Sequence, residues 1–284
     1  MININKAVID TTAYLKPVSS VAKAPKSLYF IGKLPEQRQK TVAIVGSRKM
    51  TSYGKEVAYK LAYELASRGV VIVSGLAIGI DAVAHEATLD AGGITIAVLG
   101  NGLPDIYPAT NRRLAERIVQ NDGAILSEYE PGTGARQHQF LERNRLESGM
   151  SDLVLVVEAA ARSGTLNTAA HALEQGKEVA AVPGNITSPT SAGCNNLIKQ
   201  GAIPITDVSD ILYILGLDDG QAQLPFAATS EEAIILSLIE SGIRDGHELL
   251  PASKLETALF NQTLSLLEIT GKIRPLGSNQ WTLR

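Results

Sequence analysis

The chain has a single cysteine, Cys194, among its 284 residues. One thiol excludes a disulfide framework within the chain and suits a reducing compartment. No apolar run approaches the roughly 18 residues that a membrane span requires. The sequence also does not open with the basic and apolar regions of a secretory signal. We therefore expect a soluble cytoplasmic protein that does not contact membranes.

Familiar catalytic and metal-binding motifs are also missing. The chain has no Walker A motif, no GxSxG elbow and no complete GxGxxG fingerprint. Its four histidines show no metal-ligand spacing with one another or with Cys194. Asp81 and His85 are one helical turn apart and could form an acid–base pair, but a helix-start carboxylate braced by His85 is the simpler interpretation. These absences favour a non-enzymatic protein without a cofactor.

Charge and aromatic content are both modest. The formal net charge is −3, and aromatic residues make up 5% of the chain. This balance excludes a wholly electrostatic nucleic-acid coat but permits a local basic pocket. Because 45% of the residues are hydrophobic, the chain can bury a substantial core. Its length suits one large and one small domain.

Short apolar runs that alternate with helical periodicity organise most of the chain. Residues 70–73 form an apolar run without polar alternation, which is typical of a strand buried on both faces of a parallel sheet. A glycine-containing turn and a helix from about residue 80 follow it. Similar units recur over residues 28–215, which predicts an α/β fold: an extended Rossmann-like, doubly wound, mostly parallel sheet. Residues 1–27, with two prolines, are expected to form an N-terminal arm.

The C-terminal part of the sequence predicts a second, smaller domain. Residues 216–228 are rich in Asp, Gly and Gln and are expected to form a linker. Residues 229–284 predict three short helices, the second over 252–259, closed by a β-hairpin, which is the winged-helix arrangement. Acidic residues outnumber basic ones there, so protein contact is at least as compatible with this domain as duplex DNA binding.

Candidate binding residues cluster after the predicted strands. Gly46, Ser47 and Arg48 follow the strand at 41–46, and Ser74, Gly75 and Gly79 follow the next strand. Loops that leave consecutive parallel strands must converge on one edge, where anions bind well. The guanidinium of Arg48 can fork onto a phosphate there, or it can pair with a carboxylate of a neighbouring loop.

Two further groups belong to the same hypothesis. Ser163, Gly164 and Thr165 stand at a helix start, which suits either an anion or an ordinary N-cap. The other group comprises an aromatic residue and nearby arginines: Arg136, Phe140, Arg143 and Arg145. Together they could stack bases and neutralise phosphates, or they could be a core phenylalanine with surface arginines.

These motifs, taken in order, resemble one known family. They are GSR (46–48), SGLAIGIDAVAH (74–85), TIAVLGNGL (95–103) with YP (107–108), LSEY (126–129), RNR (143–145), SGTL (163–166) and GCNNLIKQGA (193–202). The chain from about residue 14 to 210 is similar to the DNA-processing protein A family (DprA/Smf), also called DNA-protecting protein.

The resemblance implies an activity and partners. Family members bind single-stranded DNA without sequence preference, act as dimers, protect incoming strands and load RecA onto them during natural transformation. It also implies a DNA pocket built from residues 46–48, the 75–79 turn and the Phe140–Arg145 segment. Many members have a helical domain before the core, for which this chain is expected to have almost no room.

Two other functions remain open from the residues. The same crevice could belong to a nucleotide-handling enzyme similar to the lysine-decarboxylase-like phosphoribohydrolases. Those enzymes carry a PGGxGTxxE loop, whereas the matching stretch here, SGTLNTA (163–169), has neither the first glycine pair nor the catalytic glutamate. The crevice could also serve as a sensor of a small nucleotide.

Overall fold

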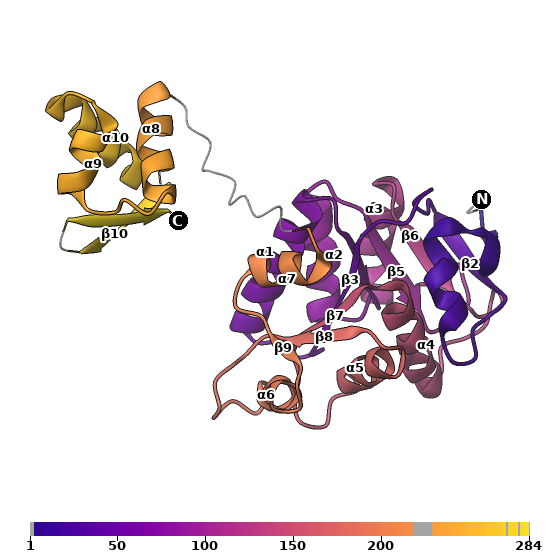
Figure 1. Ribbon diagram of the computed structural model, residues 1–284. Coiled ribbons are helices and arrows are strands. Elements are labelled where there is room, and N and C mark those ends of the chain that lie inside the picture. The colour runs from indigo at the N-terminus through magenta and orange to yellow at the C-terminus, as the bar shows by residue number, and fades with distance from the viewer. Residues whose placement is uncertain (1–2, 218–228, 271, 278, 284) are drawn as a thin grey trace. The chain divides into compact units, whose positions relative to one another are not determined.

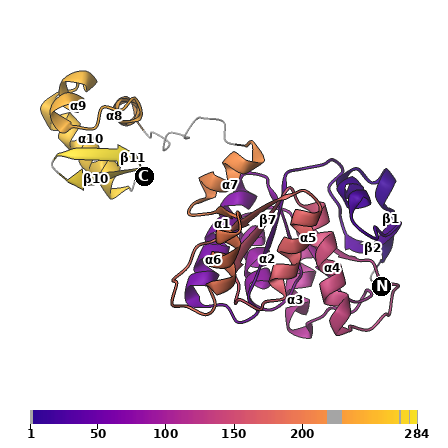
Figure 2. The same ribbon diagram turned by 60° about the horizontal axis from the view of Figure 1, so that its bottom comes forward.

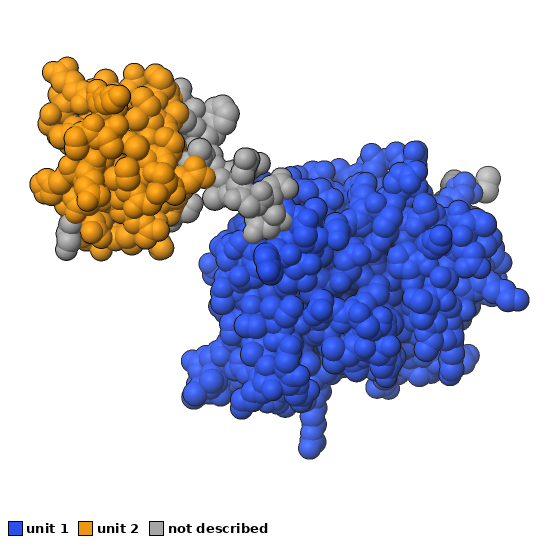
Figure 3. Space-filling view, in the orientation of Figure 1, with its two compact units in different colours: residues 1–217 blue, residues 218–284 orange. Residues whose placement is uncertain are grey.

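The computed structural model describes residues 3–217, 229–270, 272–277 and 279–283. The chain divides into two compact units, residues 1–217 and 218–284, which Figure 3 colours separately. Of the expected linker at 216–228, residues 218–228 lie outside the described part of the chain. Within the described segments, no helix is long and apolar enough to cross a membrane.

The larger unit is built on a sheet to which nine strands of its described residues contribute. Their spatial order is β1-β2-β6-β5-β4-β3-β7-β8-β9. All neighbours from β6 to β9 pair in parallel, whereas β2 is antiparallel to both β1 and β6. The predicted mostly parallel α/β fold is therefore confirmed. The strands are β1 (Asn5–Val8), β2 (Ser27–Gly32), β3 (Thr41–Gly46), β4 (Val71–Ser74), β5 (Thr95–Leu99), β6 (Ala124–Ser127), β7 (Leu153–Glu158), β8 (Glu178–Ala181) and β9 (Ile203–Pro204).

Helices cover both faces of this sheet (Figures 1 and 2). Along β3, Val42 and Ile44 face the layer of α1, α2 and α7, while Ala43 and Val45 face α5 and α6 on the other side. Such fully apolar strands form because both faces are buried. The α-helices are α1 (Ser52–Ser67), α2 (Ile80–Asp90), α3 (Arg112–Gln120), α4 (Gln137–Met150), α5 (Thr165–Glu174), α6 (Ala192–Lys199) and α7 (Val208–Leu215).

The N-terminal segment is part of the larger unit, so the prediction of an arm is wrong. Strand β1 pairs with β2 along its whole length. The 3-10 helix over Ala13–Ser20 buries Tyr14 and Leu15 completely. The Tyr14 hydroxyl hydrogen-bonds with Thr41 Oγ1 at 3.1 Å, and burial raises the pKa of this phenol to about 12. A 3-10 segment lacks the 3.6-residue apolar period, so the sequence pattern does not mark its buried face.

The described residues of the smaller unit form three helices followed by a hairpin, as expected. They are α8 (Ser230–Glu240), α9 (Gly246–Ser253), α10 (Thr257–Ile269), β10 (Ile273–Gly277) and β11 (Gln280–Leu283). The prediction that the second helix spans 252–259 is wrong. That helix begins after Asp245, whose Oδ1 accepts a hydrogen bond from the His247 amide at 2.8 Å, and it ends where Lys254 adopts a left-handed conformation.

The strand order reverses at β3, because the chain builds outward through β4, β5 and β6 and then returns to β7 on the other side. Ligands of open α/β sheets bind at this kind of switch point. The turn after β4 packs directly on the loop after β3: the Ile80 amide donates to Ser47 O at 3.2 Å. Gly79 makes this approach possible, because it has φ +90° and a Cβ there would lie 2.2 Å from Ser47 O.

Replacing Gly79 by Ala should therefore destabilise the larger unit by about 2–4 kcal/mol, from backbone strain and the clash with Ser47 O. Gly92→Ala is the matched control, because Gly92 also has positive φ but open space around its Cβ position. It should cost about 1 kcal/mol. Urea denaturation of the two variants measures the difference, and equal losses would show that the two loops can separate freely.

Candidate functional site

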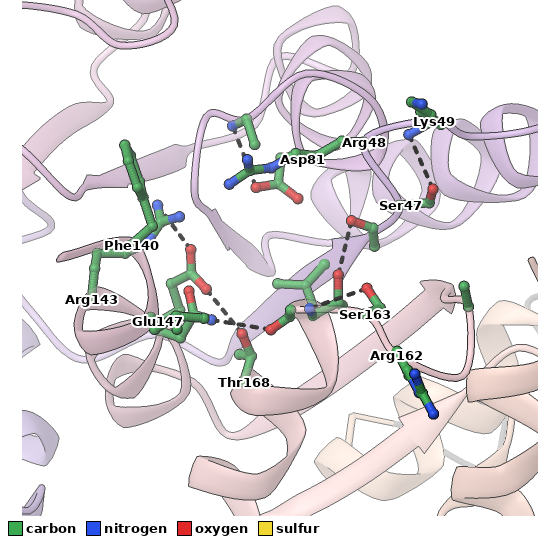
Figure 4. Close-up of a pocket in the computed structure, with 18 of the residues that line it drawn as sticks. Ser47, Arg48, Lys49, Asp81, Phe140, Arg143, Glu147, Arg162, Ser163 and Thr168 are labelled. Carbon is green, nitrogen blue, oxygen red and sulfur yellow. Dashed lines mark hydrogen bonds and ion pairs between the residues drawn. The ribbon is translucent and has the colours of Figure 1, made fainter. Parts of the chain in front are cut away.

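A cavity of about 590 Å³ lies at the switch point. Its walls come from the loop after β3, the first half of α4 and the loop that leads from β7 into α5 (Figure 4). The predicted candidates that line it, or a smaller hollow beside it, are Gly46, Ser47, Arg48, Gly75, Phe140, Arg143, Ser163, Gly164 and Thr165. Candidates from four separate segments of the chain are thus brought to one edge of the sheet.

Arg48 contributes an exposed positive charge to the lining of the cavity. Its guanidinium carbon lies 5.8 Å from the centre of the Phe140 ring, within the range of a cation–π contact. The Phe140 ring in turn contacts Tyr107, with ring centres 5.3 Å apart. Within the described segments, Arg48 forms no ion pair with a carboxylate, so its charge stays available to an anion.

Arg143 has a different role from the one expected. Its side chain is only 4% exposed and pairs with Glu147, with 3.0 Å between Nη1 and Oε1. The same Nη1 donates to Val98 O, and Glu147 Oε1 accepts no hydrogen bond from any described residue, so the pair is an ion contact without hydrogen-bond alignment. The guanidinium also fills the space beside Gly75. Arg143 therefore supports the 75–79 turn rather than offering a free charge.

The other candidates from this segment and from β4 lie away from the cavity lining. Arg145 pairs with Glu128 at 2.6 Å and also donates to Lys23 O. Arg136 is exposed just before α4, and its amide donates to Gln139 Oε1. Ser74 is fully buried and donates to Ile44 O at 2.7 Å. Gly79 shapes the turn without lining the cavity.

The start of α5 forms the opposite wall. Thr165 Oγ1 donates to Gly46 O at 3.0 Å, which ties this wall to the end of β3. Ser163 Oγ accepts from the Thr165 amide at 3.2 Å. In the part of the chain that the structure describes, the amides of Ser163 and Gly164 donate to no protein acceptor. The N-cap of α5 is Gly164, without a side-chain cap hydrogen bond, so an ordinary cap by Ser163 or Thr165 is not what the structure shows. A helix N-terminus with free amides suits an anion, which stays a prediction.

Two carboxyls and a histidine lie buried beneath the cavity. Burial raises the pKa of Glu147 to about 7 against the lowering effect of Arg143, and it also raises the pKa of Asp81. Asp81 accepts hydrogen bonds from the amides of Gly75 and Ala77. His85 does not brace Asp81 as expected, because its Nδ1 hydrogen-bonds with Thr95 Oγ1, and burial lowers its pKa to about 3.

Sequence reasoning missed Tyr107 and Arg162. Tyr107 is 50% exposed and borders the smaller hollow next to Phe140. Arg162 contributes to the cavity lining from the loop after β7, but Figure 4 shows its side chain turned away from the other labelled residues. Tyr107 precedes Pro108 in a long loop without periodicity, so its aromatic character and its place in the YP motif (107–108) are the signals that could have marked it. No group of three or more metal-ligating side chains occurs among the described residues.

Comparison with known proteins identifies the family. The profile of the family described as DNA recombination-mediator protein A matches residues 5–216. The chain belongs to this family. The expected resemblance is therefore confirmed.

Individual relatives show the same match. Protein Smf of Escherichia coli is 46% identical over 248 residues, and the DNA processing protein DprA of Bacillus subtilis is 40% identical over 224 residues. These alignments cover 85% and 78% of this chain. The chain spans 66% of the E. coli relative, just under two thirds, and 75% of the B. subtilis relative.

Two solved structures of family members share the fold. DNA processing protein A of Streptococcus pneumoniae superposes with a TM-score of 0.69 at 39% identity, covering 74% of each chain. The Helicobacter pylori protein gives a TM-score of 0.68 at 33% identity, covering 76% of this chain and 97% of that one. The H. pylori structure is described as showing a single-stranded DNA binding mode.

Arg143→Ala should lower the free energy of unfolding by about 3–5 kcal/mol, because it leaves the Glu147 carboxylate buried and unpaired. The unpaired carboxyl takes up a proton in the folded state more readily than in the unfolded state, so the loss should be larger at pH 8 than at pH 6. Arg48→Ala should change stability by less than about 0.5 kcal/mol. Denaturation at both pH values tests this contrast, and similar stabilities for both variants would refute it.

Proposed function

We propose that the cavity at the switch point binds single-stranded DNA without sequence preference. The observation that carries this proposal is the exposed Arg48, which forms no ion pair among the described residues and lies beside the half-buried Phe140 ring. A cation next to an aromatic face suits a phosphate followed by a stacked base. The free amides of Ser163 and Gly164 on the opposite wall support a second phosphate contact.

The lack of sequence preference follows from the kinds of groups present. Aromatic faces accept any base, and backbone amides and arginine contact the sugar–phosphate chain common to all sequences. The negative net charge of the whole chain makes a localised crevice a better candidate than a broad electrostatic surface. The H. pylori structural relative supports the same ligand class.

The finer role rests on family membership. The family description, a DNA recombination mediator, supports a protein that delivers single strands to the RecA recombinase and protects them meanwhile. We also propose that the chain forms a homodimer and acts in natural transformation. Its smaller unit would be a winged-helix domain that contacts protein or DNA. Residues 28–215, with the N-terminal strand added, would form the DNA-binding domain.

A binding role fits the cavity better than hydrolysis of a nucleotide. The carboxyls that border it, Asp81 and Glu147, lie under the surface and are held by amides of the 75–77 turn and by Arg143. A phosphoribohydrolase needs a carboxylate that reaches its substrate, and Thr168 occupies the position that the glutamate of the GTxxE motif would take. The proposal is therefore of a non-enzymatic protein.

Arg48→Ala should weaken oligo-dT binding about tenfold or more and reduce the salt dependence, lowering the slope of log K against log salt by about 0.7. The reason is the loss of one phosphate contact. Fluorescence anisotropy with labelled oligo-dT at several salt concentrations measures both quantities. Arg113→Ala removes the same charge from the exposed surface of α3 and serves as the control. Equal effects of the two variants would contradict the proposed site.

A further inference from the structure

A second hollow, of about 500 Å³, adjoins the cavity. It is lined by the N-terminal end of α1 and by the loop that follows β8: Thr51, Tyr53, Pro183, Gly184, Asn185, Ser188, Thr190 and Ser191. Thr190 lines both spaces, so the hollow continues the cavity along the carboxyl edge of the sheet from β3 and β7 toward β8.

The lining of this hollow contains no charged side chain. The end of α1 that borders it, where free amides would favour an anion, is already compensated, because the buried Glu158 carboxylate accepts a hydrogen bond from the Thr51 amide at 2.9 Å. A phosphate would therefore find no partner of opposite charge there. The hollow suits a neutral, planar group with polar edges.

Tyr53 provides the flat surface for such a group. Its side chain is 48% exposed, and its hydroxyl donates to Pro183 O at 2.8 Å, which fixes the ring against the loop after β8. Asn185 stands in the same lining and holds its Oδ1 toward the Thr187 amide. Its Nδ2 donates to no protein acceptor within the described residues, so it can donate to a base carbonyl.

We infer that this hollow is a nucleobase subsite, in which a base of the bound strand stacks on Tyr53 while a neighbouring phosphate lies at Arg48. The inference rests on the proposed function and extends it. The single strand then runs along the sheet edge, with phosphates held at the cavity and one base held at the hollow. Stacking on an aromatic ring preserves tolerance of any sequence.

Tyr53→Ala should weaken oligo-dT binding about five- to tenfold, the effect of losing one stacked base. It should leave the salt dependence unchanged, because no phosphate contact is lost. Binding of an oligomer of abasic deoxyribose phosphates should be the same for Tyr53→Ala and the unaltered protein. Tyr53→Phe keeps the ring and should retain most of the affinity.

Tyr63→Ala is the matched control. Tyr63 is 41% exposed on the same helix, roughly 15 Å further along, and it does not line the hollow. It should bind oligo-dT normally. Tyr53→Trp adds a direct readout, because a stacked thymine should quench the new indole emission.

These variants distinguish failure of the base subsite from failure of the proposed single-stranded DNA binding. Normal oligo-dT binding by Tyr53→Ala, together with weak binding by Arg48→Ala, would overturn the base subsite and leave the proposed function standing. An equal loss of abasic and oligo-dT binding in Tyr53→Ala would also overturn it, because the hollow would then hold the backbone. Normal binding by both variants would remove the proposed function itself.

Discussion

The close contact between two backbone turns determines the rest of this site. Gly79 lets the turn after β4 lie against Ser47 and Arg48, at a distance that any side chain would prevent. The Ile80 amide then donates to Ser47 O and starts α2 at the same point. Because β3 lies at the reversal of strand order, this contact fixes the loop that carries Arg48 at the place where the sheet opens a crevice.

The two arginines near the crevice, Arg143 and Arg48, have different roles because one is buried and the other is exposed. Arg143 forms an ion pair with Glu147, donates a hydrogen bond to Val98 O and fills the space beside Gly75. Arg48 is exposed, lies over the Phe140 ring and forms no ion pair with a carboxylate within the described residues. A buried arginine in an ion pair, such as Arg143, supports the wall of the cavity. An exposed arginine without an ion pair, such as Arg48, can bind a phosphate and release the water and counterions around it. The proposed DNA contact thus depends on the structural arginine without including it.

The fold was predictable because its strongest signals are local. Mostly apolar runs such as 41–46 and 153–158 favour strands buried on both faces, and parallel strands bring their following loops to one edge. The same argument located the loops of Gly46 and Gly75. It could not locate Tyr14, which is buried in a 3-10 segment without an α-helical apolar period.

The partners of individual side chains were less predictable. Arg143 and Glu147 are four residues apart on a helix, so a pair was possible, but their burial depends on packing against the distant Val98 strand. Likewise, the contact between Tyr107 and Phe140 joins a long loop to α4, which no sequence period encodes. Local sequence gives the position of a candidate residue along the chain, whereas its availability to a ligand depends on tertiary neighbours.

The central claim is that a single strand lies in the crevice between the β3 loop and α4. Photo-crosslinking with oligo-dT that carries 5-iodouracil, followed by peptide mapping, tests this most directly. The account predicts crosslinks to the aromatic residues that border the crevice, Tyr107 and Phe140, with unlabelled oligo-dT competing for them. Crosslinks confined to residues 229–284, with none around the crevice, would contradict it.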